Sequence, residues 1–301
     1  MTQLVDLRDL GADLRRGSEN AAPEELWCEG NLQLLSGRLA SIVGTRDISP
    51  EGVQRTRKLT TILVKEGFCV VSGLAKGVDR VAHETALSLD GSTIAVMGTP
   101  IDECYPAEHR ELKEEIARRG LVLSQFAPGT PIRRSNFPRR NVLMARISST
   151  TFVVEAGIDS GTQHQVRAAV QMGKKVAFLA SLVSQDYPWV QEAVETGCGV
   201  IIRHAVDAVE LLREVRGRTA ADAPADLPPI SWEQDEFEMP TAALSRASYK
   251  EIHKALLEPE GADVDPNGHF QTDFPLEVLG AHKPTFFERI WSLILGATAK
   301  H

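Results

Sequence analysis

The stretch Leu-Ala-Ser-Ile-Val-Gly-Thr-Arg at residues 39–46 decides the fold of this chain. Its nearly continuous apolar start is typical of a strand that is buried on both faces of a parallel sheet. The run stops at Gly44, where a backbone without a Cβ can turn tightly or approach a ligand. Ser49 or Asp47 then provides an N-cap for a following helix. This layout suits a bound phosphate, whereas the simpler interpretation is a tight turn with a solvated Arg46.

Short apolar runs and helical spacing alternate along the rest of the chain. Further strands are predicted over residues 68–71, 93–97, 121–124, 151–154, 175–179 and 199–202. A chain that alternates strand and helix in this way is typical of an α/β protein with a doubly wound parallel sheet and helices on both faces. Ligands of such sheets bind at the carboxyl ends of the strands, at the point where the winding reverses.

Three of the predicted strands end in loops that contain glycine. One loop follows Val43, the second is Ser72–Asp79, and the third is Gly157–Thr162 after the strand that ends at Glu155. Because parallel strands end on one edge of the sheet, we expect the three loops to form a common site. The alternative is that the glycines only serve ordinary turns.

The composition is ordinary for a soluble globular protein. The 301 residues are 43% hydrophobic and 25% charged. We recognise no signal peptide, and no apolar run approaches the ~20 residues of a membrane helix. The four cysteines are widely spaced and include no CxxC pair, which favours reduced thiols over disulfides or a zinc site. We therefore expect a cytoplasmic protein that does not bind a membrane.

The formal net charge of −8 is unevenly distributed along the chain. Residues 1–36 carry a balance of −4, residues 37–216 of +3, and residues 217–301 of −7. Net charge bears on partners and solubility and not on fold. The acidic residues are thus concentrated in the flanks of a mildly basic middle.

The same three segments outline the predicted domain organisation. Residues 1–36 have the pattern of a helical or irregular lead-in, with leucines at 4, 7 and 10. Residues 37–216 hold the repeated strands and helices. Residues 217–301 are predicted to be a linker followed by an acidic C-terminal extension. In that extension Phe286–Leu295 has one apolar helix face, which would dock on its own domain or recruit a partner.

The most distinctive cluster lies over residues 133–146. It contains five arginines around Phe137 and no acidic residue. Arginine forks pair with phosphates, and an aromatic ring stacks on an unpaired base for ~1–3 kcal/mol. The cluster therefore indicates a track for single-stranded nucleic acid, with a solvated basic rim around a core Phe137 as the alternative.

Side chains that could catalyse a reaction are less distinctive. Ser72 and Ser124 have no histidine near them in the sequence. His83 and His164 lie at predicted helix starts, and Glu155 could orient a ribose or a water, or simply cap a helix. No group of residues has the spacing of metal ligands, so we expect neither catalysis nor a metal.

Taken in order, these motifs resemble the DprA/Smf family of the SLOG/Rossmann-like superfamily. The segments that carry the resemblance are Ile42–Arg46, Val70–Asp79, Gly91–Gly98, Tyr105-Pro106, Phe137-Pro138, Arg140-Asn141, Val153–Ala156 and Ser160–Thr162. The resemblance implies a Rossmann-like domain that binds single-stranded DNA and forms a homodimer. It also implies a role in DNA processing, recombination and transformation, in which the protein loads a RecA-type recombinase and needs no cofactor or catalysis.

The resemblance further implies which residues contact the strand. By position, the three loops would hold phosphates, and the segment that begins at Phe137 would meet the strand. The residues concerned are Gly44, Thr45, Arg46, Gly73, Lys76, Gly77, Phe137, Arg139, Arg140, Asn141, Ser160, Gly161 and Thr162.

Other functions remain open at this stage. Glu155–Thr162 loosely resembles the catalytic loop of phosphoribohydrolases, so the chain could bind a nucleotide-derived ligand as a sensor, for instance in phage defence. It could also cleave an N-glycosidic bond with help from Glu155 or His164. A third hypothesis is a scaffold whose C-terminal helix recruits a partner. The acidic tail could also inhibit DNA binding by competing for the arginines.

Overall fold

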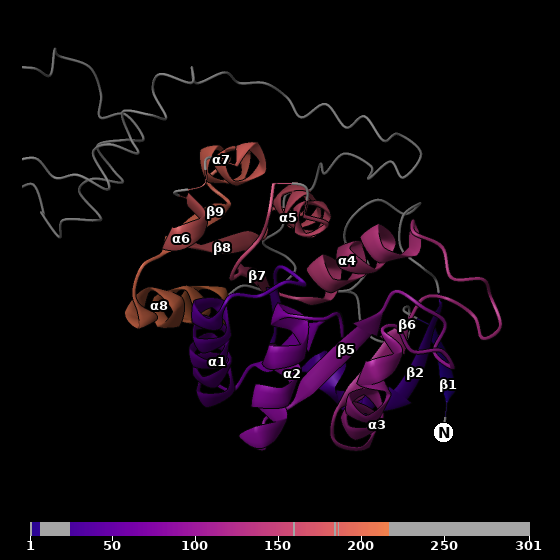
Figure 1. The fold of residues 1–301 in the computed structure, drawn as a ribbon. Coiled ribbons are helices and arrows are strands. Elements are labelled where there is room, and N and C mark those ends of the chain that lie inside the picture. The colour runs from indigo at the N-terminus through magenta and orange to yellow at the C-terminus, as the bar shows by residue number, and fades with distance from the viewer. Residues whose placement is uncertain (1, 7–24, 159, 184, 186, 217–301) are drawn as a thin grey trace, which may run out of the picture. The chain divides into compact units, whose positions relative to one another are not determined.

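The computed structural model describes residues 2–6, 25–158, 160–183, 185 and 187–216, and it contains every strand predicted after residue 36. The strands are β3 (Leu39–Val43), β4 (Cys69–Ser72), β5 (Thr93–Met97), β6 (Leu121–Ser124), β7 (Thr150–Val153), β8 (Lys175–Leu179) and β9 (Gly199–Ile202). They lie in the order β6-β5-β4-β3-β7-β8-β9, and all neighbours in this set are parallel. The predicted doubly wound α/β sheet is thus confirmed (Figure 1).

The prediction of a helical or irregular lead-in is wrong for residues 3–6 and 25–30, which form strands, whereas Leu32–Ser36 is a short turn of helix. β1 (Gln3–Asp6) and β2 (Glu25–Gly30) extend the sheet, with β2 antiparallel to both β1 and β6. In β2, Leu26 and Cys28 are buried while Trp27 between them is half-buried, which is the two-residue period of a strand. The leucine at position 4 lies in β1, whereas those at 7 and 10 lie outside the described residues. The sheet is therefore mixed at this edge.

Helices cover both faces of the sheet (Figure 1). One layer contains α1 (Pro50–Lys65), α2 (Val78–Ser88), α3 (Arg110–Arg119) and α8 (Ala205–Arg216). The other layer contains α4 (Asn136–Ile147), α5 (Thr162–Gln171) and α7 (Pro188–Glu195). Short turns of helix are η3 (Leu32–Ser36), η4 (Ala107–His109) and α6 (Ala180–Val183).

Helix α4 begins five residues before the predicted Asn141, so much of the arginine cluster lies on a helix.

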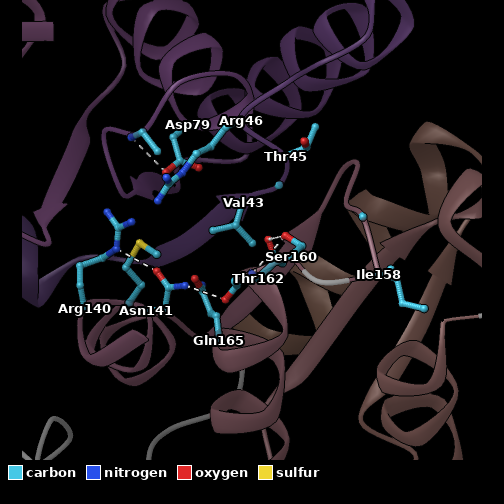
Figure 2. Close-up of a pocket in the computed structure, with 15 residues that line it drawn as sticks. Val43, Thr45, Arg46, Asp79, Arg140, Asn141, Ile158, Ser160, Thr162 and Gln165 are labelled. Atoms are coloured by element: carbon cyan, nitrogen blue, oxygen red, sulfur yellow. Dashed lines mark hydrogen bonds between the residues drawn. The ribbon is translucent and has the colours of Figure 1, made fainter. Parts of the chain in front are cut away.

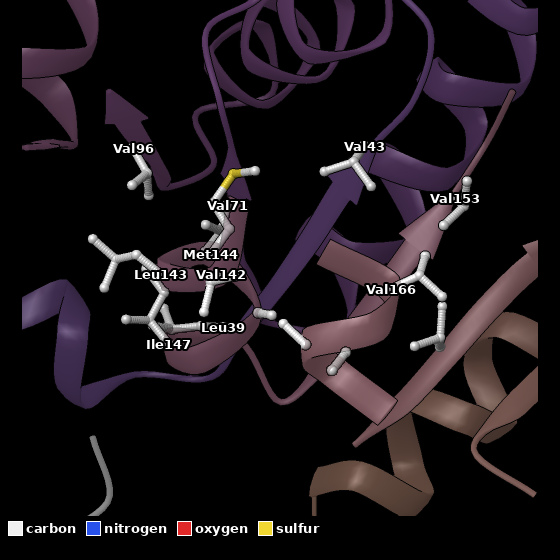
Figure 3. Packing of buried hydrophobic residues seen from close by; sticks show 14 of the residues in the cluster. Leu39, Val43, Val71, Val96, Val142, Leu143, Met144, Ile147, Val153 and Val166 are labelled. Carbon is white, nitrogen blue, oxygen red and sulfur yellow. The ribbon is translucent and has the colours of Figure 1, made fainter. Parts of the chain in front are cut away.

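All five residues of β3 are buried, as its apolar sequence predicts. Leu39 and Val43 pack with Met144 and Val166 under α4 and α5 (Figure 3). The alternate residues Ala40 and Ile42 pack on the opposite face with α1, α2 and α8. Each large apolar side chain buried in this way contributes roughly 1.5–3 kcal/mol to the free energy of unfolding. Because its side chains alternate between the two faces, β3 contributes to the cores on both sides of the sheet.

The winding of the sheet reverses at β3. From β3 the chain moves outward through β4, β5 and β6, and it returns to pair β7 with the other side of β3. The loops after β3 and β7 therefore leave the sheet side by side. The backbone N–H of Thr45 donates to the carbonyl of Glu155 at 2.6 Å, which ties the two loops together.

Residues 217–301 lie outside the described residues, and so do the predicted linker and the Phe286–Leu295 helix. Among the described helices, none is long and apolar enough to cross a membrane.

Candidate nucleic-acid interface

A pocket of about 620 Å³ lies at this switch point (Figure 2). Its walls come from the loop after β3, the loop before α2, helix α4, and the loop that leads into α5. The lining residues are Val43, Gly44, Thr45, Arg46, Ala75, Asp79, Arg140, Asn141, Met144, Gly157, Ile158, Ser160, Gly161, Thr162 and Gln165. Predicted site residues from the first loop, the arginine cluster and the third loop therefore line one pocket.

The first loop presents a cation at the mouth of this pocket. A Cβ on Gly44 would lie 2.5 Å from the carbonyl oxygen of Glu155, so only glycine permits this close approach of the two loops. Thr45 accepts a hydrogen bond from the N–H of Asp47 at 3.1 Å. Arg46 is exposed, and its guanidinium carbon lies 5.7 Å from the centre of the Phe137 ring. Arg46 is thus held beside an aromatic ring and faces solvent.

The third loop presents hydroxyl groups and the start of a helix. The Ser160 hydroxyl donates to the Thr162 hydroxyl at 2.9 Å, and the Thr162 N–H donates back to Ser160 at 3.3 Å. The Asn141 amide donates to the Gly161 carbonyl at 2.9 Å, which fixes the loop to α4. Because α5 begins at Thr162, its partial positive charge lies at the pocket, as an anion site requires.

A buried pair of opposite charges, Arg140 and Asp79, lies in the pocket wall. Arg140 is only 4% exposed and donates to the carbonyls of Gly73 and of Val96, the latter at 2.9 Å. Asp79 accepts hydrogen bonds from the N–H groups of Gly73 at 3.1 Å and Ala75 at 3.3 Å.

Burial raises the pKa of the Asp79 carboxyl, while Arg140 and the two N–H groups lower it. Burial likewise lowers the pKa of Arg140, which Asp79 opposes. Because both side chains hydrogen-bond to the backbone of Gly73, the pair joins the second loop to α4.

None of the three predicted residues of the second loop lines the pocket, and neither do Phe137 and Arg139. Lys76 extends to Glu108, and the two charges lie 2.9 Å apart on the surface. Gly73 is buried against Arg140, and Gly77 adopts a φ of +73° beside the backbone of Thr45. Their contact with a strand remains a prediction.

An aromatic surface continues outward from Arg46. Phe137 is half-buried and meets Tyr105 edge to face, with ring centres 5.7 Å apart. Tyr105 is 53% exposed, and the guanidinium of Arg139 lies over the ring of Phe126 at 5.4 Å. Tyr105 belongs to one of the motifs that carry the family resemblance, but it is not among the residues predicted to contact the strand. The signal that identifies it is spatial, because it lies 32 positions before Phe137.

The structure also shows why two polar residues of the pocket were not assigned to it. Gln165 is fully buried, and its amide donates to Ser41 at 2.8 Å and to Thr151 at 3.3 Å. In the sequence, Asp79 is identified only as the last residue of the second loop. The partners of Gln165 come from distant segments, so no local pattern reveals it, whereas Asp79 accepts hydrogen bonds from Gly73 and Ala75 of its own loop.

Glu155, the carboxylate considered for catalysis, is hydrogen-bonded to the N-cap residue of α1. Glu155 does not line the pocket, and its Oε2 accepts the N–H of Ser49 at 3.3 Å and its hydroxyl at 2.9 Å. Ser49 in turn accepts the Gly52 N–H at 2.9 Å as the N-cap of α1. Asp79 is the carboxylate among the described lining residues, and it is buried. This arrangement does not favour N-glycosidic hydrolysis.

The fold defines the class: a Rossmann-like α/β protein with a pocket at the switch point of its sheet. The family described as DNA recombination-mediator protein A matches residues 12–215, and the chain belongs to this family.

Two curated relatives illustrate the similarity. Protein Smf of Synechocystis sp. is 40% identical over 168 residues, which cover 56% of this chain and 40% of that protein. The putative DNA processing protein DprA of Mycobacterium tuberculosis is 31% identical over 281 residues, which cover 90% of this chain and 67% of that protein. The chain thus spans 40% of the length of the first and 67% of the second.

Solved structures of the family have the same fold. DNA processing protein A from Streptococcus pneumoniae superposes with a TM-score of 0.62 at 30% identity, covering 69% of this chain and 73% of that one. The protein from Helicobacter pylori has a TM-score of 0.62 at 26% identity, covering 72% and 96%. The Helicobacter pylori protein binds single-stranded DNA.

Proposed function

We propose that this chain binds single-stranded DNA at the switch-point pocket and acts in DNA processing and recombination. The observation that carries the proposal is the convergence of exposed Arg46 and the start of α5 on one pocket, with the rings of Phe137 and Tyr105 beside Arg46. The single-stranded DNA binding of the Helicobacter pylori relative supports it.

The polar groups of this surface suit the phosphate of a nucleotide, and its aromatic rings suit the base. Arg46 and the hydroxyls of Thr45 and Thr162 would bind phosphate oxygens. The rings of Phe137 and Tyr105 would stack on bases, and only unpaired bases expose their faces in this way. The surface therefore favours a single strand over a duplex.

We further propose that the protein acts without catalysis, in the cytoplasm, as a homodimer that hands the strand to a RecA-type recombinase. Family membership supports the recombinase role, and the capping role of Glu155 supports binding without hydrolysis. Incubation with nucleoside monophosphates tests the last point, because release of free base would contradict it.

The proposal is tested by replacing Arg46 with alanine and using Arg38 as the matched control. Both arginines are exposed and flank β3, Arg46 at its carboxyl end and Arg38 at its amino end. Fluorescence anisotropy with an oligothymidylate of about 20 nucleotides should show Arg46→Ala binding roughly tenfold more weakly, with a salt slope lower by about 0.7. Arg38→Ala should bind like the wild type.

The same titration with a duplex and with an abasic strand completes the test. We expect the wild type to prefer the single strand over the duplex, and to bind the abasic strand more weakly because base stacking is lost. Equal affinity for single strand and duplex, or equal effects of the two alanine variants, would overturn the proposal.

A further inference from the structure

A second pocket, of about 310 Å³, lies at the carboxyl ends of β8 and β9 between α1 and α8. We call it the α1–α8 groove. The lining residues are Arg55, Lys58, Leu59, Ile62, Leu179, Ala180, Ser181, Ile202, Arg203, His204, Ala205 and Ala208. Helices α1 and α8 pack side by side here (Figure 1).

The charged side chains that line the groove are all basic. Arg55 and Lys58 come from α1, and Arg203 comes from the turn before α8; all three are exposed. Arg55 Nη1 donates to the Ser181 hydroxyl at 3.2 Å, which holds its guanidinium over the groove. The carboxylate of Asp207, the acid nearest in sequence to Arg203, is occupied by the N–H groups of Arg203 and His204 at 2.7 and 2.8 Å.

The floor of the groove is apolar. Leu59, Ile62 and Ala208 come from the two helices, while Leu179 and Ile202 end the two strands. Carbon surface under a basic rim fits a nucleoside phosphate, because the base and sugar can cover the floor while guanidinium groups pair with the phosphate.

The groove and the switch-point pocket lie on the same edge of the sheet. β7, β8 and β9 are parallel neighbours, so the loops after them leave the sheet on one side. Helix α1 runs from beside the switch-point pocket to the groove, because its N-cap Ser49 donates to Glu155 in the loop after β7 and its next turns carry Arg55 and Lys58. A strand that leaves the first pocket along α1 would meet the second.

We propose that the α1–α8 groove binds a further nucleotide of the same single strand, with its phosphate against Arg55, Lys58 and Arg203. This inference rests on the proposed function of the switch-point pocket. It predicts that short oligonucleotides occupy the first pocket alone and that longer ones gain affinity from the groove.

The test compares two double variants of equal charge in the full chain. Arg55→Gln with Arg203→Gln removes two basic groups of the groove. Arg57→Gln with Arg213→Gln removes two exposed arginines of the same helices that do not line it. Anisotropy is measured with oligothymidylates of about 6 to about 30 nucleotides. For the long strands the groove variant should bind at least tenfold more weakly than the control, with a salt slope lower by about 1.4. For the shortest strand the two variants should bind alike.

The outcomes separate this inference from the proposal on which it rests. If the wild type binds no oligothymidylate, both are overturned. If the wild type binds normally and the groove variant behaves like the control at every length, only the inference is overturned. Calorimetry with thymidine monophosphate separates the two sources of a nucleoside phosphate. Groove-dependent binding of the free nucleotide, without a length effect in the strand assay, would overturn the inference in favour of a small-molecule site.

Discussion

At the scale of the residue, Gly77 shows how closely the loops of the switch point pack. Its φ is +73°, and a Cβ there would overlap the carbonyl oxygens of Thr45 and Arg46. The next N–H, of Val78, donates to the Thr45 carbonyl at 3.1 Å. Gly77 therefore lets the second loop support the first, even though it does not line the pocket.

Replacing Gly77 with alanine tests this supporting role, and Gly129 is the matched control. Gly129 has a φ of +74° with nothing within 4 Å of a Cβ, so Gly129→Ala carries the backbone strain alone, about 1–2 kcal/mol. Gly77→Ala adds a steric overlap and should cost about 1–3 kcal/mol more, and it should also weaken DNA binding. Urea unfolding and anisotropy measure both effects, and equal values for the two variants would contradict the packing role.

His83 is a second residue whose role is decided by its surroundings. It is fully buried, and its Nδ1 lies 2.7 Å from the Thr93 hydroxyl, which itself donates to the Val70 carbonyl at 2.8 Å. Nδ1 is therefore the donor in its hydrogen bond to Thr93. Burial lowers the pKa of His83 to about 3, and the charges of His109 and Arg140 act in the same direction.

This pKa predicts a pH dependence of stability. Between about pH 3 and the ordinary histidine value of 6.5, the unfolded chain binds a proton at His83 that the folded chain does not. Stability from this group is therefore lost as the pH falls through that window, by about 2 kcal/mol at about pH 5. His83→Gln, which keeps a donor for Thr93, should flatten the pH profile of urea unfolding. A profile parallel to that of the wild type would refute the assignment.

At the scale of the element, helix α1 begins with a cap that extends across the switch point. Ser49 caps α1 through the Gly52 N–H and donates its hydroxyl to Glu155, which lies 106 residues away in the sequence. The sequence predicted a cap at Ser49 or Asp47, and Ser49 is confirmed. Because Glu155 lies in the loop after β7 and Ser49 follows the loop after β3, this hydrogen bond holds the two loops next to each other.

A double-mutant cycle on Ser49 and Glu155 tests this link between the elements. Ser49→Ala should cost about 1 kcal/mol, as the loss of an N-cap does. Glu155→Gln should cost a similar amount, and the double variant should cost about 0.5–1 kcal/mol less than the sum, because the two act through one interaction. Ser88→Ala, near the end of α2, should instead add to Ser49→Ala without coupling. Additivity of Ser49 and Glu155 would refute the link.

Elements were predictable where a local pattern identified them. β3 and its parallel neighbours carry apolar runs because both of their faces are buried. The start of α4 was missed because Ser135 makes no side-chain capping bond there, so nothing local marks Asn136 as helical. The strand β2 was missed because it joins the sheet by pairing with β6, and three other strands lie between these two in the sequence.

At the scale of the whole molecule, charge is distributed unevenly along the chain. Residues 37–216 are mildly basic, whereas residues 217–301 carry a balance of −7 and lie outside the described residues. An acidic segment on the same chain would compete with DNA for the arginines, and salt would screen this competition.

Removing residues 217–301 tests this competition. The shortened protein should bind an oligothymidylate several-fold more tightly than the full chain at about 50 mM salt, and the two should converge at about 300 mM. Anisotropy at both salt concentrations measures the effect. Equal affinity at low salt would exclude a competing tail.

The sequence by itself determined the parallel strands β3 to β9 and the glycine loops that follow β3, β4 and β7, because burial on both faces demands apolar runs and close turns demand glycine. Only the tertiary structure decided which side chains face the pocket. Arg140 lies in the pocket wall with its donors bound to Gly73 and Val96, Lys76 pairs with Glu108, and Arg46 remains exposed. The physical reason is that these partners come from segments that the fold brings together although they are distant in the chain, so their pairing is a property of the topology.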